Sequence, residues 1–192
     1  HYALLTIGED GTPTFGTPVP MPGSVSISLD ANGEPENFYA DGGVYYVINN
    51  NCGYDGDLEL ALIPESFRTD ILKETLDSKG VLIENSEVEL AAFALLFEFD
   101  GDQKHIRHVL YNCSASRPGI EGKTNEDSKE VQTEKLSLKA VPLANGMVKA
   151  KTGNTTDATT YANWYKAVYM PTAENTEAST QAASKTTKAV KE

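Results

Sequence analysis

Short segments in which apolar and polar residues alternate one by one recur along this chain, and they constrain its fold more than any other feature. In the segment SVSISLD, Val25, Ile27 and Leu29 share one side of an extended chain while serines occupy the other side. The segment TEKLSLKAVP (residues 133–142) repeats the pattern with leucines and lysines. A period of two is the period of a β-strand with one buried face. The alternation therefore predicts a mainly β fold.

Further strands are expected on the same grounds, separated by the turn dipeptides Asn32-Gly33, Gly42-Gly43, Asp100-Gly101 and Asn145-Gly146. The segment Ala91–Phe99 is apolar on both faces almost to its end, which predicts a strand covered on both sides. The expected strands are Tyr2–Ile7, 24–30, 37–41, 44–48, 57–62, Ala91–Phe99, Lys104–Ser116, 133–140, 147–151 and an aromatic terminal strand at 161–171.

One substantial helix is expected, at Pro64–Leu76. Proline suits the first position of a helix, and Phe67, Ile71 and Leu72 then form an apolar stripe at helical spacing. Gly80 follows as the expected C-terminal cap.

Three carboxylates stand close together in the segment DGDLE: Asp55, Asp57 and Glu59. Their spacing of two puts them on one face of a strand. A calcium loop would need further ligands that the expected helix displaces, and glycosidase acid pairs come from separate elements. The pattern therefore favours the solvated face of a strand, with ion binding and acid/base catalysis as alternatives. The opposite face carries the leucines expected in the core: Leu58, Leu60 and Leu62.

Other reactive side chains form no recognisable catalytic set. His105 and His108 are three apart on an expected strand, so they project to opposite faces and cannot share a metal ion. His108 has apolar neighbours on its side and is expected to be an interior or interface imidazole. No nucleophile, zinc, phosphate-loop or dinucleotide motif occurs. We therefore expect neither an enzyme nor a cofactor.

Two further features have competing interpretations. Cys52 and Cys113 lie far apart without CxxC spacing, which favours two buried thiols over one disulfide. Trp164 and the tyrosines around it favour a packed terminal strand, with a sugar-binding platform as the alternative.

The length, the apolar content and the net charge further limit the classes of protein to which this chain can belong. The 192 residues are 40% hydrophobic, enough for one core. No apolar run approaches the roughly 20 residues that span a bilayer, and no signal-peptide pattern opens the chain. The net charge is −12, with a balance of −15 in residues 1–100 and +3 in residues 101–192. Without clustered Lys and Arg, the chain is not a tight binder of nucleic-acid phosphates.

One β domain is expected over residues 1–171. The polar segment 117–132 reads as a long loop within it, and such loops are usually functional or disordered. The segment 172–192 has almost no large apolar residue and is expected to be a disordered tail.

Four sequence blocks, in this order, resemble the phi13-type major tail protein family of long, non-contractile-tailed phages and prophages. They are GYDGDLELALIPESFRTDIL, FALLFEFDGD with RHVLYNCSASRPG, QTEKLSLKAVPLANGMVKA and WYKAVYMP. The likeness covers most of residues 2–171 and leaves the terminal tail outside. The resemblance is specific because the four blocks occur together in this order. No single block identifies the family by itself.

The resemblance implies a β-sandwich or barrel-type tail tube fold with one flanking helix and long assembly loops. It also implies hexameric rings that stack into a tube around a tape-measure protein, through which double-stranded DNA later passes without specific binding. The protein would be made in the bacterial cytoplasm and reside in the virion tail, away from membranes.

Two groups of residues become candidates for assembly under this resemblance. Asp55, Asp57 and Glu59 are candidates for an acidic lumen or an interface, because a lumen must not hold phosphate. Residues 117–132 are a candidate inter-subunit arm, which includes Arg117, Pro118, Gly119, Ile120, Glu121, Lys123, Glu126 and Asp127.

Two alternative functions stay open at this point. A secreted β-sandwich adhesion or carbohydrate-binding module would bind glycans through exposed Tyr and Trp. A head–tail or tail-terminator protein of a phage would form a single ring and stop.

Overall fold

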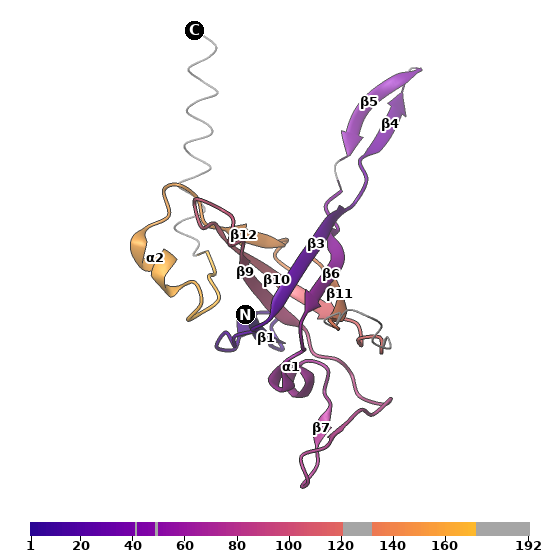
Figure 1. Cartoon of the computed structure of the whole chain (residues 1–192). Coiled ribbons are helices and arrows are strands. Elements are labelled where there is room, and N and C mark those ends of the chain that lie inside the picture. Colours follow the sequence, from indigo (N-terminus) through magenta and orange to yellow (C-terminus); the bar gives the residue numbers. More distant parts are fainter. Residues whose placement is uncertain (41, 49, 121–131, 172–192) are drawn as a thin grey trace, which may run out of the picture.

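The chain folds into a mainly β structure, as expected. The computed structural model describes residues 1–40, 42–48, 50–120 and 132–171 (Figure 1). Most of the candidate arm and the whole expected tail, residues 121–131 and 172–192, lie outside the described residues. The elements are β1 Tyr2–Ile7, β2 Pro13–Phe15, β3 Ser24–Asn32, β4 Glu36–Ala40, β5 Gly43–Ile48, β6 Gly53–Leu60, α1 Glu65–Asp70, β7 Thr75–Leu76, β8 Leu82–Ile83, β9 Phe93–Glu98, β10 Arg107–Ala115, β11 Glu134–Ala140, β12 Lys149–Lys151 and α2 Ala158–Asn163.

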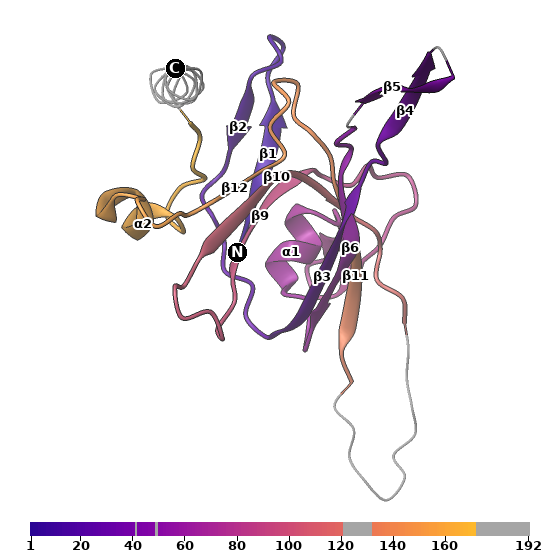
Figure 2. The ribbon, with the colours of Figure 1, turned by 90° about the horizontal axis from the view of Figure 1, so that it is seen from above.

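A single antiparallel sheet in the order β2-β1-β9-β10-β11-β6-β3 forms the body, and β12 pairs with β10 beside it. On one side, strand β10 pairs with two strands. Its first half pairs with β12, and its end pairs with β11. Between Leu110 and Cys113 the register of β10 against β9 shifts, and such irregularities bend a strand. Figure 2 shows the result, a sheet that turns so that β3, β6 and β11 stand across from β1, β9 and β10. Figure 1 shows that α1 lies at the lower end of the sheet.

The register of β3, β6 and β11 explains the alternation in the sequence. Ile27, Leu58 and Leu136 lie opposite one another across the three strands and face inward. One residue along, Ser28, Asp57 and Ser137 are also paired and face outward. The predicted inward face of residues 133–140 is confirmed, since Leu136, Leu138 and Ala140 are all buried.

Strand β9 is covered on both faces, as its uniform apolarity predicts. Phe93 and Leu95 belong to the core between the two halves of the sheet, next to α1. Ala94 and Leu96 point the other way, into a second core that Trp164 and other residues of the C-terminal segment complete.

Helix α1 is shorter than predicted. It covers Glu65–Asp70 rather than Pro64–Leu76, although the predicted stripe of Phe67, Ile71 and Leu72 is buried. The helix stops because Lys73 takes a positive φ of 59°, a conformation that an α-helix does not contain. The chain then forms the small hairpin β7–β8, whose turn contains Gly80 at φ 79°. Gly80 is therefore a turn residue and not a helix cap.

Three further sequence predictions were wrong in detail. Leu62 is 67% exposed, because β6 ends at Leu60 and the chain turns before α1. The expected terminal strand is instead helix α2 and a following turn, and the side chain of Asp157 caps the helix by accepting a hydrogen bond from the Thr160 N–H at 2.9 Å. Both cysteines are free, as favoured, but Cys52 is exposed and only Cys113 is buried.

Candidate assembly surfaces

The first candidate surface is the distal part of a long two-stranded ribbon. Strands β3 and β6 pair within the sheet, and the ribbon continues past the Cys52 N–H···O=C Asn32 hydrogen bond of 2.9 Å into β4 and β5. At this junction Gly33 has φ 117°, and a Cβ there would stand 2.2 Å from the Asn50 carbonyl oxygen. Only glycine fits such a position, so Gly33 allows the two strands of the ribbon to approach closely at this junction.

The β4–β5 hairpin stands clear of the body in both ribbon views (Figures 1 and 2). Its strands carry exposed apolar side chains, with Tyr39 at 67%, Tyr45 at 65% and Val47 at 50% exposure. A two-stranded hairpin is marginally stable by itself in water, and several large apolar side chains exposed on one small element are typical of an interaction site. This hairpin therefore has the character of a binding element.

The outer face of β3, β6 and β11 holds the three carboxylates predicted to share a face, and the structure confirms that arrangement. The Asp57 carboxylate accepts from Lys135 Nζ at 3.0 Å and from Ser137 Oγ at 2.9 Å, and these two hydrogen bonds lower its pKa. Glu59 accepts from Thr133 Oγ1 at 2.6 Å and from Ser26 Oγ at 2.9 Å, which lowers its pKa as well. Asp57 and Glu59 are therefore ionised at neutral pH and lie in a polar ladder across three strands.

Asp55 differs from the other two carboxylates. Its Oδ2 accepts from Asn32 Nδ2 at 2.7 Å, while its buried Oδ1 has no hydrogen-bond partner within the described part of the chain. In the same part of the chain no three His, Cys, Asp or Glu side chains are placed to hold a metal ion. The interactions of all three acids are therefore with neighbouring strands.

The candidate arm begins from a fixed point. Arg117 pairs with Glu84 at 3.0 Å, and its Nη2 donates to the Asn85 carbonyl at 3.4 Å. Pro118 is half-buried, and Gly119 and Ile120 are exposed. The remaining candidates of the arm, Glu121, Lys123, Glu126 and Asp127, lie outside the described residues.

Where the chain re-enters the sheet, Glu134 is held by two donors. Its Oε2 accepts from the Ile63 N–H at 2.6 Å, and its Oε1 accepts from Arg68 Nη2 at 2.5 Å. Arg68 also pairs with Glu74 at 3.0 Å. This cluster joins α1 to the start of β11. Sequence reasoning missed it, since Glu134 lies more than 60 residues along the chain from Ile63 and Arg68 and shares no motif with them.

The two histidines are separated, as predicted, although His105 lies in the turn before β10 and not on a strand, with φ 47°. The His108 ring stacks on Phe97 at 5.1 Å between ring centres, with Phe99 at 5.7 Å. Burial and the neighbouring Lys151 and Lys149 lower the pKa of His108, so its ring is neutral near pH 7.

The aromatic C-terminal segment is packed against the sheet. Trp164 is buried, stacks on Tyr169 and donates from Nε1 to the His108 carbonyl at 3.3 Å. A buried indole offers no face to a sugar, which contradicts its use as a glycan platform. Arg107 holds the segment by lying 3.9 Å from the centre of the Tyr161 ring.

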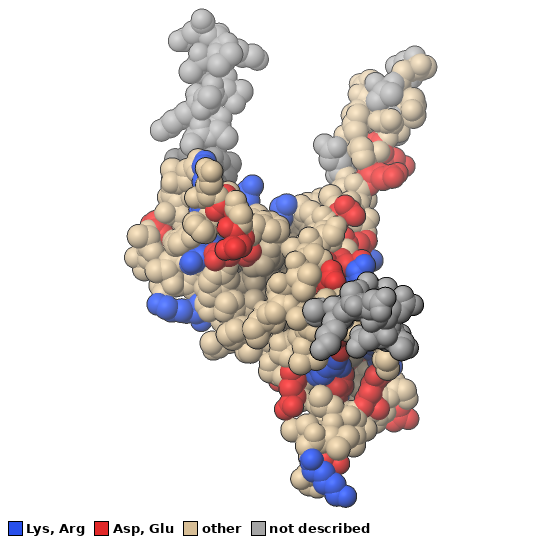
Figure 3. All heavy atoms as spheres, viewed as in Figure 1, with Lys and Arg blue, Asp and Glu red and all other residues tan. Residues whose placement is uncertain are grey.

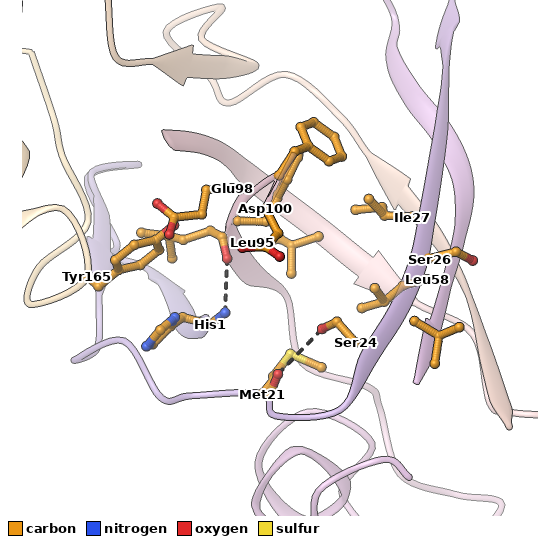
Figure 4. Close-up of a pocket in the computed structure, with 14 residues that line it drawn as sticks. His1, Met21, Ser24, Ser26, Ile27, Leu58, Leu95, Glu98, Asp100 and Tyr165 are labelled. Atoms are coloured by element: carbon orange, nitrogen blue, oxygen red, sulfur yellow. Dashed lines mark hydrogen bonds between the residues drawn. The ribbon is translucent and has the colours of Figure 1, made fainter. Parts of the chain in front are cut away.

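A second candidate surface was not foreseen. The apolar face of β3 was expected to be core, but much of it borders an open cleft between β3 and the β9–β10 end of the sheet. One half of the cleft has a volume of about 460 Å³ and includes Met21, Leu58 and Leu95 (Figure 4). The other half has a volume of about 380 Å³. Both halves share Ile27, Phe97 and Phe99, so they form one continuous cleft.

Among the described residues, no helix is long and apolar enough to cross a bilayer.

Comparison with known proteins yields matches among solved structures only, and two of them are described here. No protein-family model and no curated protein matches the chain. A chain of the anti-feeding prophage cap, a tube-terminating cap, is 10% identical with a TM-score of 0.38, over 79% of this chain and 87% of that one. A chain of the anti-feeding prophage baseplate is 10% identical with a TM-score of 0.37, over 81% of this chain and 93% of that one. Both TM-scores lie below 0.5, so the description of the fold rests on the chain's own strands.

Proposed function

We propose that this chain is a non-enzymatic structural subunit that assembles with its own copies into stacked rings, forming the tail tube of a phage of the phi13 type. The observation that carries the proposal is the β4–β5 hairpin, which exposes Tyr39, Tyr45 and Val47 away from the body. Such a hairpin gains stability only when another surface covers it. The order of the four sequence blocks supports a tube subunit over other kinds of self-assembling protein.

A tail tube subunit has three kinds of partner in this proposal. They are further copies of the chain in rings, six to a ring by the family resemblance, a tape-measure protein inside the tube, and double-stranded DNA in transit. In this proposal the hairpin of one copy enters a different patch on the next copy without a reciprocal exchange, so the contact is head-to-tail. A head-to-tail contact propagates into a ring or a filament instead of closing a dimer.

Electron microscopy of the purified protein at high concentration tests the proposal. We expect hollow tubes of uniform width. A variant in which residues 34–50 are replaced by Asn-Gly joins β3 to β6 through a short hairpin turn, and it should stay folded by circular dichroism yet form no tubes. Single rings that never stack would favour a tail terminator, and glycan-dependent binding without polymer would favour the adhesion module.

The polar outer face of β3, β6 and β11 is proposed to line the tube lumen. Ionised Asp57 and Glu59 would repel DNA phosphates there, so that the genome slides instead of binding. Replacing both by lysine should leave tube formation intact and reduce genome delivery by assembled particles. Unchanged infectivity of that double variant would refute a lumenal position. The control with the same change of charge is the double variant Glu87→Lys and Glu89→Lys on the exposed segment before β9.

Residues 117–132 are proposed to be an inter-subunit arm. Arg117 and Glu134 fix the two ends of the segment on the body. Replacing residues 120–131 by a short Gly-Ser linker, with both anchors kept, should give a folded monomer that no longer polymerises. Normal tubes from this variant would show that the segment has another role.

A further inference from the structure

We infer that the β4–β5 hairpin of one copy binds in the half of the cleft lined by His108 and Lys149 on a second copy. The inference rests on the proposed function, because it names the two surfaces through which the copies associate. Three features carry it: the apolar lining of the cleft, the composition of the hairpin and the distribution of charge between them.

The cleft is suited to aromatic side chains. Ile27 and Leu29 of β3 form one wall, and Phe97 and Leu110 lie across from them. Its volume of about 380 Å³ is in the range of pockets that enclose small ligands, about 300–1,000 Å³. An apolar space of this size between two halves of a core is costly to leave in water.

The rim of the cleft already binds one tyrosine ring. Lys149 Nζ lies 4.3 Å from the centre of the Tyr54 ring, a cation–π contact. The stacked rings of His108 and Phe97 offer aromatic edges and faces nearby. The hairpin supplies matching groups, since Tyr39 and Tyr45 are the most exposed of its described large apolar side chains.

The distribution of charge favours the half of the cleft lined by His108 and Lys149, over the other half, as the binding site of the hairpin. The ribbon from residue 24 to residue 60 contains seven acids and no Lys or Arg. Glu34 and Glu36 are exposed at the base of the hairpin, where Figure 3 shows acidic side chains below a tip without Lys or Arg. Lys149 and the nearby Lys151 are exposed beside the His108 half. The other half instead includes Glu98 and Asp100, which would repel the ribbon.

The hairpin cannot reach the cleft of its own chain. It is a direct continuation of β3 and β6 and points away from the body in both views (Figures 1 and 2). The occupant is therefore the hairpin of a second copy. Each copy offers one hairpin and one cleft, so the contact repeats from copy to copy.

Disulfide trapping between two differently tagged chains tests the inference. Both chains carry Cys52→Ser, which removes the exposed native thiol and leaves the buried one. The donor chain carries Asn37→Cys, opposite Val47 in the hairpin, so that no aromatic residue is lost. The receiving chain carries Phe99→Cys on the cleft rim, or Ile83→Cys on β8 as the control. These two positions are each 48% exposed. Lys149→Cys is a second receiving variant, in case Phe99→Cys does not fold.

The mixed disulfide is measured on non-reducing gels and mapped by mass spectrometry. We expect it with the Phe99→Cys or Lys149→Cys chain and only background amounts with the Ile83→Cys chain. Equal yields with all three, a dominant hairpin–hairpin disulfide, or no disulfide with either cleft variant would overturn the inference. Electron microscopy of the same mixtures separates the two proposals. If tubes form without the hairpin–cleft disulfide, the cleft is not the binding site, but the proposed tail tube function stands. If the disulfide forms without tubes, the hairpin binds the cleft, but the proposed tail tube function is wrong.

Discussion

Replacing Tyr39 by threonine should raise the concentration needed for assembly without destabilising the monomer. Threonine keeps the strand-favouring β-branched shape but removes the aromatic ring that the hairpin exposes. The residue is 67% exposed in the single chain, and changes at such positions alter stability by within about 0.5 kcal/mol. The effect on assembly should therefore be separable from folding.

The exposed area sets the size of the effect. An aromatic side chain buries about 150–250 Å² when fully covered, so 67% exposure leaves about 100–170 Å² to be buried on docking. At about 25 cal/mol per Å² this is worth about 2.5–4 kcal/mol. Association recovers only part of such area terms, and threonine keeps some contact. We therefore expect a loss of about 1.5–2 kcal/mol, which raises the critical concentration by about 10- to 30-fold.

Sedimentation of assembled protein over a concentration series measures the critical concentration directly. The matched control is Leu62→Thr, whose side chain is equally exposed at 67% but lies beyond the far end of β6. A critical concentration for Tyr39→Thr within about twofold of the parent chain, or an equal rise for Leu62→Thr, would show that the hairpin does not drive assembly.

Three further predictions concern the body of the protein. Replacing Glu134 by alanine leaves two donors without their acceptor and should lower the free energy of unfolding by about 2–4 kcal/mol, measured by urea denaturation; a change below about 0.5 kcal/mol would contradict the contacts described. The folded-state pKa of His108 is lowered, so the unfolded chain binds its proton more readily, and stability should fall as pH drops below about 6.5. Melting curves between pH 7.5 and 5.5 should show a smaller loss for His108→Phe than for the parent chain, and equal losses would exclude His108 as the cause. Cys52 should react with a thiol reagent in the folded protein, whereas buried Cys113, whose pKa is raised to about 12, should react only after denaturation; labelling of both thiols at one rate would contradict its burial.

Local features of the fold could be predicted from the sequence because they depend on near neighbours. Alternation placed Leu136 and Leu138 inside and put Asp57 and Glu59 on the opposite, polar face of their sheet, since side chains of a strand alternate wherever the strand lies. The Gly42-Gly43 dipeptide likewise predicted the β4–β5 hairpin, because its turn forms within a few residues.

Element ends and exposure were harder to predict for a physical reason. The stripe of Phe67, Ile71 and Leu72 indicates a helix and is buried, yet the helix ends early where Lys73 takes a positive φ. Val25 repeats the alternation in the sequence but is 56% exposed, because the register of β3 against β6 shifts between Ser24 and Ser26. Ile27 and Leu29 keep the alternation and still line the open cleft. Alternation reports which side a residue faces and does not report whether another layer covers that side.

The sequence by itself determined a β-rich chain, the shared face of Asp55, Asp57 and Glu59, and a hairpin in the ribbon that connects β3 with β6. Only the tertiary structure decided that this hairpin leaves the body, that Glu134 joins α1 to β11, and that an apolar cleft stays open beside β3. Each of these depends on how segments far apart in the chain meet. That meeting is set by strand order and by the bend of the sheet at β10, which no local pattern encodes.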